Sequence, residues 1–470
     1  MEPNQKYRLE SDSIGEKEVP AEAYYGVQSL RAMENFPVTG RRMIPEYIKA
    51  MALLKKACAI LNGEAGILTK DVADAIVAAS DEVMEGKYAD EFIVDPVQGG
   101  AGTSYNMNMN EVLANVANEK LGGGRGDYTY CNPNDHVNNG QSTNDIVPTA
   151  GKITILWLLR PLEKNLQAVI GSFKEKGVEF NNVIKMGRTQ MEDAVPIRLG
   201  QEFNAYASAL TRSLNRIKEA EKELYSINMG GSAIGTGINA DLHYFHGIVP
   251  KIAELTGEPF YQAEDLIDGT MHTDCYVAVS SSMKELAVSI SKICNDLRLM
   301  ASGPNTGFGE ISLPARQNGS SIMPGKVNPV IPEMVNQVAF RIIGSDMTIT
   351  MACEGGQLEL NAFEPITFYS LFESIQMMTN ALVPFKNYCV DGINANIEHC
   401  RRLLEASTGI ATALNPYIGY KASAQLIKDA KKAGKTLKQM AEDEAILPED
   451  QLEKVLDPVA MTTPGIPGKK

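Results

Sequence analysis

Residues 283–300 read MKELAVSISKICNDLRLM and place large apolar side chains at positions 283, 286, 290, 293, 297 and 300. The steps between these positions alternate between three and four residues, which aligns the side chains in one stripe along a helix. Related spacings recur at about residues 150–178, 203–224 and 371–389. A helix of about 25–30 residues is about 40 Å long, roughly twice the usual length. Long helices with such stripes are typical of the seams of a bundle.

Strand signals are sparse elsewhere, and strands do not alternate with helices, which argues against a doubly wound sheet. We therefore predict a mainly α fold, with a long central helical bundle and smaller N- and C-terminal domains. Loops with proline and glycine around residues 95–103 and 131–148 precede the long helices, and short charged helices follow them. One of these short helices is predicted by the capping box Thr436-x-x-Gln439. The expected domains are residues 1–142, 143–395 and 396–470.

The composition excludes a disordered or collagen-like chain. Apolar residues make up 44% of the 470 residues and charged residues 22%, as in ordinary globular proteins. The 44 Lys and Arg residues against 58 Asp and Glu residues give a net charge of −14, so neither nucleic acid nor an anionic membrane is an expected partner. The polar N-terminus and seven scattered cysteines, none in a C-x-x-C pair, favour a cytoplasmic protein with reduced thiols.

Four polar loops interrupt the helical pattern, and each is rich in hydroxyl groups, amides or glycine. They read GGAGTSYN at 99–106, HVNNGQSTND at 136–145, GRTQ at 187–190 and GSSIMPGKVNP at 319–329. Serine, threonine and asparagine at the ends of helices are most often capping residues, and capping is the alternative interpretation of each loop taken alone.

The loop at 319–329 is harder to explain by capping. Its two glycines and two prolines surround the Ser320–Ser321 pair and a single cation, Lys326, as expected of a segment that closes on a ligand. Lys326 and Asn328 can hold a carboxylate, whereas the loops at 99–106 and 136–145 supply neutral donors that suit a second carboxylate. We therefore interpret the loops as parts of a site for an anionic small molecule.

The stretch 319–329 closely resembles the most specific motif of the aspartase/fumarase superfamily, and the similarity runs from Ala23-Tyr24-Tyr25-Gly26 to Leu414-Asn415-Pro416. The resemblance implies a homotetramer whose central helices form a twenty-helix core. It also implies elimination of a leaving group from a succinyl framework, with release of fumarate. Two details resemble the members that eliminate ammonia from L-aspartate, namely QSTND at 141–145 and VIPE at 330–333.

The resemblance implies roles for individual residues. Deprotonated Ser320 would be the base that removes a proton from C3, which gives an enediolate intermediate, and Lys326 and Asn328 would hold the α-carboxylate. The other implied substrate-binding residues are Thr103, Ser142, Thr143 and Ser321 at the β-carboxylate, and Asn144, Thr189 and Gln190 at the amino group. No organic cofactor or catalytic metal is implied, and a divalent cation as activator is compatible with the family.

The resemblance also implies that each site is shared between three subunits. Thr103 and 142–144 would come from one subunit, 189–190 from a second and 320–328 from a third. The physical reason is that these loops are widely spaced along very long helices, and a rod of about 40 Å cannot fold back to join its own ends.

The sequence departs from the family pattern in three places. Gln190 replaces the histidine of fumarases and of some aspartases, which weakens any scheme in which a histidine at 190 handles the leaving group. The pair Asn139–Gly140 and the four residues Asn305–Phe308 also differ from the residues that are common in the family at these positions. Three alternatives remain: a fumarate hydratase acting on L-malate, a lyase acting on another amino acid, and a catalytically silent helical scaffold. Intact Ser320, Lys326 and Asn328 argue against the scaffold.

Overall fold

The computed structural model describes residues 6–469 and divides the chain into two compact units. The first unit comprises Met1–Glu163, Asn215–Glu285 and Phe340–Met377, and the second comprises Lys164–Leu214, Leu286–Ala339 and Met378–Lys470. The predicted mainly α fold is confirmed, because helices dominate and each sheet of the described residues has only two strands. The expected domain boundaries at residues 142 and 395 stay a prediction.

The long helices lie where the apolar spacing predicts them. They are α5 (Thr143–Glu179), α6 (Leu199–Ala220), α9 (Asp274–Met300) and α11 (Glu364–Tyr388). The six stripe residues of α9 are each at most 5% exposed, as expected of a bundle seam. A further long helix, α10 (Val330–Glu354), was not predicted, because its apolar residues cover more than one face instead of forming one stripe.

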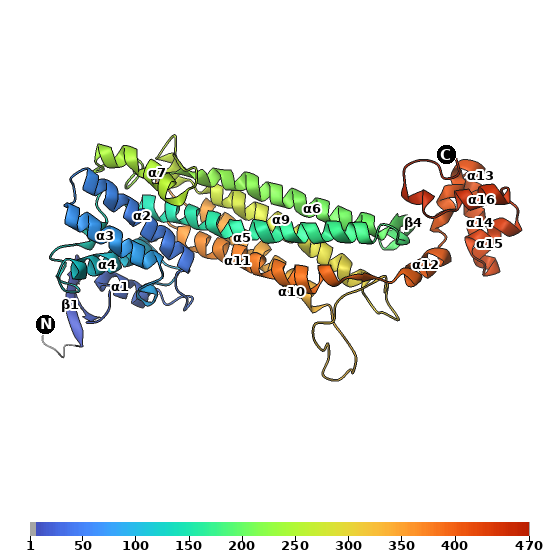
Figure 1. Cartoon of the computed structure of the whole chain (residues 1–470), viewed down its shortest axis with the longest axis horizontal. Coiled ribbons are helices and arrows are strands. Elements are labelled where there is room, and N and C mark those ends of the chain that lie inside the picture. Colours follow the sequence, from blue (N-terminus) through green and yellow to red (C-terminus); the bar gives the residue numbers. More distant parts are fainter. Residues whose placement is uncertain (1–5, 470) are drawn as a thin grey trace. The chain divides into compact units, whose positions relative to one another are not determined.

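In the first unit, α2 (Pro45–Glu64) packs against α3 (Lys70–Met84) and α7 (Leu242–Thr256), and α3 packs against α4 (Thr103–Lys120) (Figure 1). Two strand pairs complete this unit, one antiparallel and one parallel. The remaining elements are β1 (Tyr7–Asp12), β2 (Gly15–Pro20), α1 (Val27–Asn35), β5 (Ser226–Ile227), β6 (Tyr261–Gln262) and α8 (Asp268–Met271).

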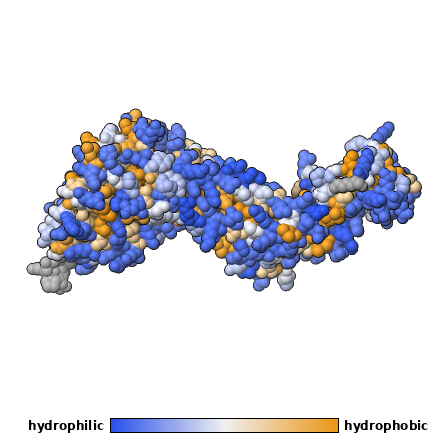
Figure 2. Space-filling view, turned by 45° about the horizontal axis from the view of Figure 1, so that its top comes forward, coloured by the Kyte–Doolittle hydropathy of each residue, from blue (hydrophilic) through white to orange (hydrophobic). Residues whose placement is uncertain are grey.

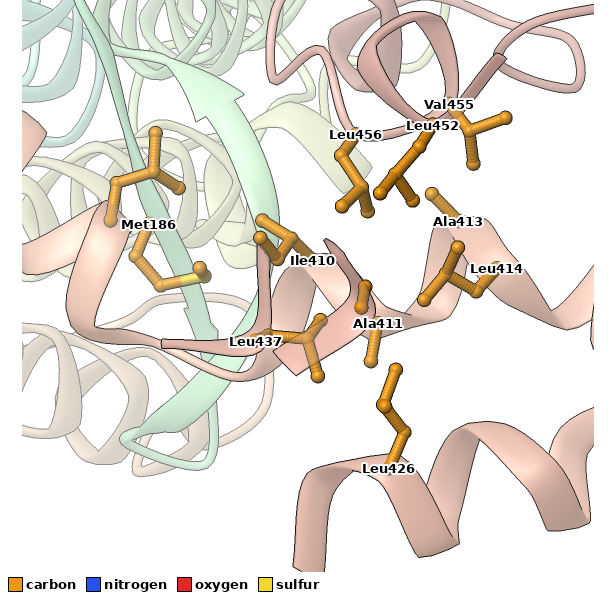
Figure 3. Packing of buried hydrophobic residues seen from close by; sticks show 12 residues of the cluster. Met186, Ile410, Ala411, Ala413, Leu414, Leu426, Leu437, Leu452, Val455 and Leu456 are labelled. Carbon is orange, nitrogen blue, oxygen red and sulfur yellow. The ribbon is translucent and has the colours of Figure 1, made fainter. Parts of the chain in front are cut away.

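In the second unit, the antiparallel hairpin of β3 (Ile184–Thr189) and β4 (Glu192–Arg198) packs on the C-terminal helices through a shared apolar cluster. Figure 3 shows Met186 of β3 together with Ile410, Leu437 and Leu456 in this cluster. The remaining elements are β7 (Ile311–Ser312), β8 (Asn394–Ala395), α12 (Ile397–Ala406), α13 (Asn415–Ile418), α14 (Tyr420–Ala433), α15 (Leu437–Asp443) and α16 (Glu449–Val455). The predicted capping box of α15 is confirmed: Gln439 N donates to Thr436 Oγ1, and Thr436 N donates to Gln439 Oε1.

Helix α5 begins at Thr143, earlier than the apolar spacing places it, and continues through Pro148. Proline has no N–H, so Pro148 leaves the carbonyl of Asn144 without its intrahelical donor. That carbonyl instead accepts a hydrogen bond from Asn228 Nδ2 at 2.9 Å. The tertiary hydrogen bond thus compensates for the proline, which explains why the helix does not break there.

Hydrophobic residues also reach the surface in patches (Figure 2). One set lies on α10 at steps of three and four residues: Phe340, Ile343, Met347 and Met351 are 62, 36, 64 and 59% exposed. We call this set the α10 apolar face. All seven cysteines are free thiols, as predicted. In the described part of the chain, no helix combines the length and apolar character needed to cross a membrane.

Candidate active site

The hydroxyl-bearing residues of the first two loops lie at the N-termini of two helices. Thr103 is the first residue of α4, Thr143 is the first residue of α5, and Ser142 precedes it. Asn106 Nδ2, one turn along α4 from Thr103, lies 3.3 Å from Thr143 Oγ1, so the structure brings the two helix starts together. Helix N-termini present free N–H groups and the positive end of the helix dipole. This arrangement therefore favours an anion such as a carboxylate.

A fully buried lysine binds side-chain amides next to these helix starts. Lys55 Nζ donates to Asn106 Oδ1 (2.7 Å), Gln141 Oε1 (2.8 Å) and Asn138 Oδ1 (3.1 Å). Burial lowers the pKa of Lys55 to about 8, and the nearby Asp145 counteracts this effect. Lys55 is not among the site residues predicted from the sequence. The signal that could have found it is the pair Lys55–Lys56 inside the otherwise apolar run Met51–Ile60, where a charge that is buried needs buried partners.

Asp145 fixes the start of α5. Its Oδ1 accepts from Ser142 N at 2.9 Å, as in a capping box, and its Oδ2 accepts from Ser232 N at 3.1 Å. Burial raises the pKa of Asp145 to about 6. Asn144 is also fixed, because its Nδ2 donates to the carbonyl of Ala233 at 2.7 Å. The amide oxygen of Asn144 is then the end of the side chain left to face a ligand.

In the second unit, Thr189 and Gln190 lie at the tip of the β3–β4 hairpin. Thr189 pairs with Glu192, so Gln190 and Met191 form a two-residue turn, with φ of +54° and +68°. Positive φ is costly for residues with side chains, and such strain concentrates at functional sites. A cavity of about 520 Å³ beside the hairpin is lined in part by Arg188, Gln190 and Phe308. A larger cavity of about 660 Å³ lies beside α12 and α15 and is lined by none of the predicted site residues.

The Ser320 hydroxyl lies in a small nest of backbone donors. Ile322 N and Met323 N both donate to Ser320 Oγ, at 3.2 and 3.1 Å. Two N–H groups directed at one oxygen favour its negatively charged form, because hydrogen bonds to the charged form stabilise it. The half-buried Ser320 therefore has an environment suited to deprotonation.

The rest of this loop is closed at its base and open at its tip. Asn328 Nδ2 donates to the carbonyl of Gly319 at 2.8 Å, and Gly319 N donates to the carbonyl of Lys326 at 2.8 Å. A Cβ at Gly319 would lie 2.6 Å from that carbonyl oxygen, so only glycine fits there. Lys326 and Ser321 are exposed, and no acidic side chain of the described residues pairs with Lys326. Lys326 is therefore available to an anionic ligand.

Within the second unit, the hairpin tip at 189–190 and the loop at 319–329 do not bind each other. No hydrogen bond or ion pair between described residues joins 189–190 to 319–329. The structure thus brings together the predicted residues at the starts of α4 and α5, and separately fixes Ser320, Lys326 and Asn328 in one loop.

Known proteins similar to this chain include both lyases and fumarases. Residues 15–344 match a family model described as Lyase, and residues 410–463 match one described as Fumarase C C-terminus. An aspartate ammonia-lyase of Bacillus sp is 52% identical over 99% of this chain and 100% of that protein. The aspartate ammonia-lyase of Escherichia coli (strain K12) is 47% identical over 98% of each.

Solved structures agree with the sequence matches. A structure described as fumarate lyase:delta crystallin from Brucella melitensis gives a TM-score of 0.94 at 46% identity, covering 97% of this chain and 100% of that chain. A class II fumarase from Schistosoma mansoni gives a TM-score of 0.94 at 35% identity, covering 97% and 99%.

Proposed function

The chain belongs to the aspartase/fumarase superfamily and eliminates ammonia from L-aspartate to give fumarate, and we propose that Ser320 is the base of this reaction. The observation that carries the proposal is the pair of N–H groups, from Ile322 and Met323, directed at Ser320 Oγ. A serine base must ionise, and these donors stabilise the alkoxide that takes the proton.

The reaction has two steps. Ser320 Oγ removes a proton from C3, and the electron pair moves into the adjacent β-carboxylate, which becomes a dianionic enediolate. This electron pair then forms the C2–C3 double bond, and the C2–N bond breaks with its electrons leaving on ammonia. The barrier lies in the charge that develops on the β-carboxylate, so donors directed at that group contribute most to the rate.

We assign the β-carboxylate to Thr103, Ser142, Thr143 and Ser321. Three of these residues lie at the N-termini of α4 and α5, where the helix dipole favours negative charge. The buried Lys55 behind them adds a positive charge without occupying the substrate's space. This combination stabilises a dianion better than surface hydroxyl groups in water would.

We assign the α-carboxylate to Lys326 and Asn328, and the amino group to Asn144, Thr189 and Gln190. The absence of an acidic partner for Lys326 among the described residues supports its assignment. The amide oxygens of Asn144 and Gln190 suit an ammonium group as acceptors. The mechanism that we propose uses protein groups alone, without an organic cofactor or a catalytic metal, and it is compatible with a divalent cation as an activator.

The assembly that we propose is a homotetramer in which three subunits contribute to each site. The α10 apolar face supports association, because four large apolar side chains at helical spacing lie exposed on a single chain. The family resemblance supplies the number of subunits and the division of the site.

The direct test adds L-aspartate and L-malate separately to the purified enzyme and follows fumarate by its ultraviolet absorbance. We expect fumarate from L-aspartate, with ammonia released in equal amount. Fumarate from L-malate but not from L-aspartate would overturn the substrate in favour of a hydratase. Activity that survives extensive chelation of divalent cations would support the cofactor-independent mechanism, and complete loss restored by one metal would contradict it.

A further inference from the structure

A buried carboxylate holds the hairpin that carries Thr189 and Gln190. Glu310 is fully buried, with Oε1 2.7 Å from Arg188 Nη1 and Oε2 2.8 Å from Lys185 Nζ. Both cations belong to β3, and Arg188 directly precedes Thr189. The Arg188 guanidinium also lies over the Phe308 ring, 4.2 Å from its centroid. One acidic side chain therefore fixes two points of the strand that leads to the hairpin tip.

Glu310 itself is held by the rest of the unit. Its N–H donates to the carbonyl of Met300, the last residue of α9, at 2.9 Å. Its carbonyl accepts from Asn396 N at 2.9 Å, and the adjacent Gly309 carbonyl accepts from Asn396 Nδ2 at 2.6 Å. The carboxylate is thus anchored to a long helix, which makes it a rigid support for the hairpin.

The hairpin needs such a support because its pairing is irregular. The register of β3 and β4 shifts at Gly187, between Met186 and Arg188, and a Cβ at Gly187 would lie 2.7 Å from the carbonyl oxygen of Val195. A bulge bends and twists a strand pair locally. Residues three apart in a regular strand face opposite sides, yet Lys185 and Arg188 both reach Glu310.

We propose that Glu310 is a positioning residue of the elimination reaction: through Arg188 it sets the place of Thr189 and Gln190 at the amino group of the substrate. The inference rests on the proposed contact between these two residues and the amino group. Glu310 does not touch the substrate and acts only through the hairpin.

A second carboxylate in the same cluster provides a matched control. Glu202 Oε1 and Oε2 accept from Lys185 Nζ at 3.0 and 3.2 Å, but Glu202 has no contact with Arg188 among the described residues. Loss of its charge disturbs the same buried cluster without releasing the hairpin tip. Glu202→Gln therefore reports the purely structural effect of the cluster.

The test uses the reverse reaction, the addition of ammonia to fumarate, because it separates the amino group from the carboxylates. In the intact enzyme bearing Glu310→Gln, we expect the KM for ammonia to rise about tenfold or more, since small misplacements of binding groups are costly. The KM for fumarate should change little, and Glu202→Gln should leave the KM for ammonia unchanged. The double variant Glu310→Gln/Thr189→Ala should lose less than the sum of the two single effects, because the contact of Thr189 with the amino group is common to both changes.

Each outcome has one meaning. If Thr189→Ala raises the KM for ammonia but Glu310→Gln does not, the positioning role is wrong and the proposed site stands. If neither Thr189→Ala nor Gln190→Ala raises that KM, the proposed contact of the hairpin tip with the amino group is wrong, and the inference falls with it. An equal rise in both KM values, or an effect of Glu202→Gln as large as that of Glu310→Gln, would also overturn the role.

If Glu310→Gln does not assemble, Arg188→Lys takes its place, because it keeps the charge but loses the contact geometry. An unchanged KM for ammonia in Arg188→Lys then overturns the inference.

Discussion

At the residue scale, Ser320 and Lys326 have separable effects on binding and chemistry. Ser320→Ala removes the group that accepts the C3 proton but no carboxylate contact, so kcat should fall by about 10²–10⁴ with KM little changed. Fumarate absorbance gives the kinetic constants. Exchange of the C3 hydrogen in deuterium oxide should be lost as well, and near-normal turnover would remove Ser320 from the base role.

Lys326→Met should act on binding instead. It deletes an exposed cation that has no acidic partner among the described residues, so the α-carboxylate would face neutral groups only. Loss of one partner of a charge pair in a closed site costs about 2–5 kcal/mol, which predicts a large rise in the KM for L-aspartate. Lys454→Met, a change in an exposed lysine of α16, is the control. An equal KM in both variants would move the α-carboxylate contact elsewhere.

At the scale of elements, the start of α11 carries a buried acid whose ionisation should depend on folding. Burial raises the pKa of Glu364 to about 8 from the usual 4.5, and Lys152 counteracts this only in part. Between these two pH values the folded chain binds a proton that the unfolded chain has lost, so stability falls as pH rises. Glu364→Gln removes this dependence. The difference between the Tm of Glu364→Gln and that of the wild type should therefore rise by roughly 2 °C or more from pH 5 to pH 8, in favour of the variant.

The exposed Glu359 provides the comparison, because Glu359→Gln should keep the wild-type dependence of Tm on pH. Parallel curves for Glu364→Gln and the wild type would mean that the Glu364 carboxylate is already ionised at neutral pH in the folded enzyme.

The elements also show how far the sequence predicts this structure. Apolar spacing predicted α5, α6, α9 and α11 because each carries large apolar residues at steps of three and four, and it missed α10 because the apolar residues of that helix lie on more than one face. It placed the start of α5 near residue 150 instead of Thr143 because the regular apolar spacing begins only later in the helix. The hydrogen bond from Asn228 that compensates for Pro148 comes from a residue 80 positions further on, so the spacing could not reveal it. The polar loops were predictable because their motif is local. Lys55 and Glu310 were not, because their partners are distant in sequence and their burial follows from packing.

At the scale of the whole molecule, shared sites predict that Thr189→Ala, which weakens binding of the amino group, and Ser320→Ala, which lacks the base, can complement each other when activity is measured at an L-aspartate concentration at which Thr189→Ala alone is nearly inactive. Thr189→Ala and Ser320→Ala, unfolded together and refolded as an equal mixture, should form hybrid tetramers. A site is intact when position 189 comes from one variant and position 320 from the other, which holds for about one site in four. Recovered activity should approach a quarter of the wild-type value. Hybrid tetramers without recovered activity would mean that each chain builds its own site.

Association itself can be tested at the α10 apolar face. Met347→Glu places a charge on a side chain that is 64% exposed in the single chain and that an interface would bury. We expect smaller species in size-exclusion chromatography, with activity lost in parallel, whereas Met347→Leu should assemble normally. Unaltered assembly of the glutamate variant would place the interface elsewhere.

The hydrogen bonds of buried Lys55 with Asn106, Asn138 and Gln141 also restrict which substitutions can accumulate during evolution. Replacing Lys55 alone leaves the amide oxygens of Asn106 and Gln141 without a donor among the described residues, and replacing Asn106, Asn138 or Gln141 alone leaves a buried ammonium short of an acceptor. Each single step passes through an intermediate with an unsatisfied buried group, which costs about 1–3 kcal/mol or more. Natural relatives should therefore keep all four residues or exchange them as a set, and drift through one position at a time should be rare.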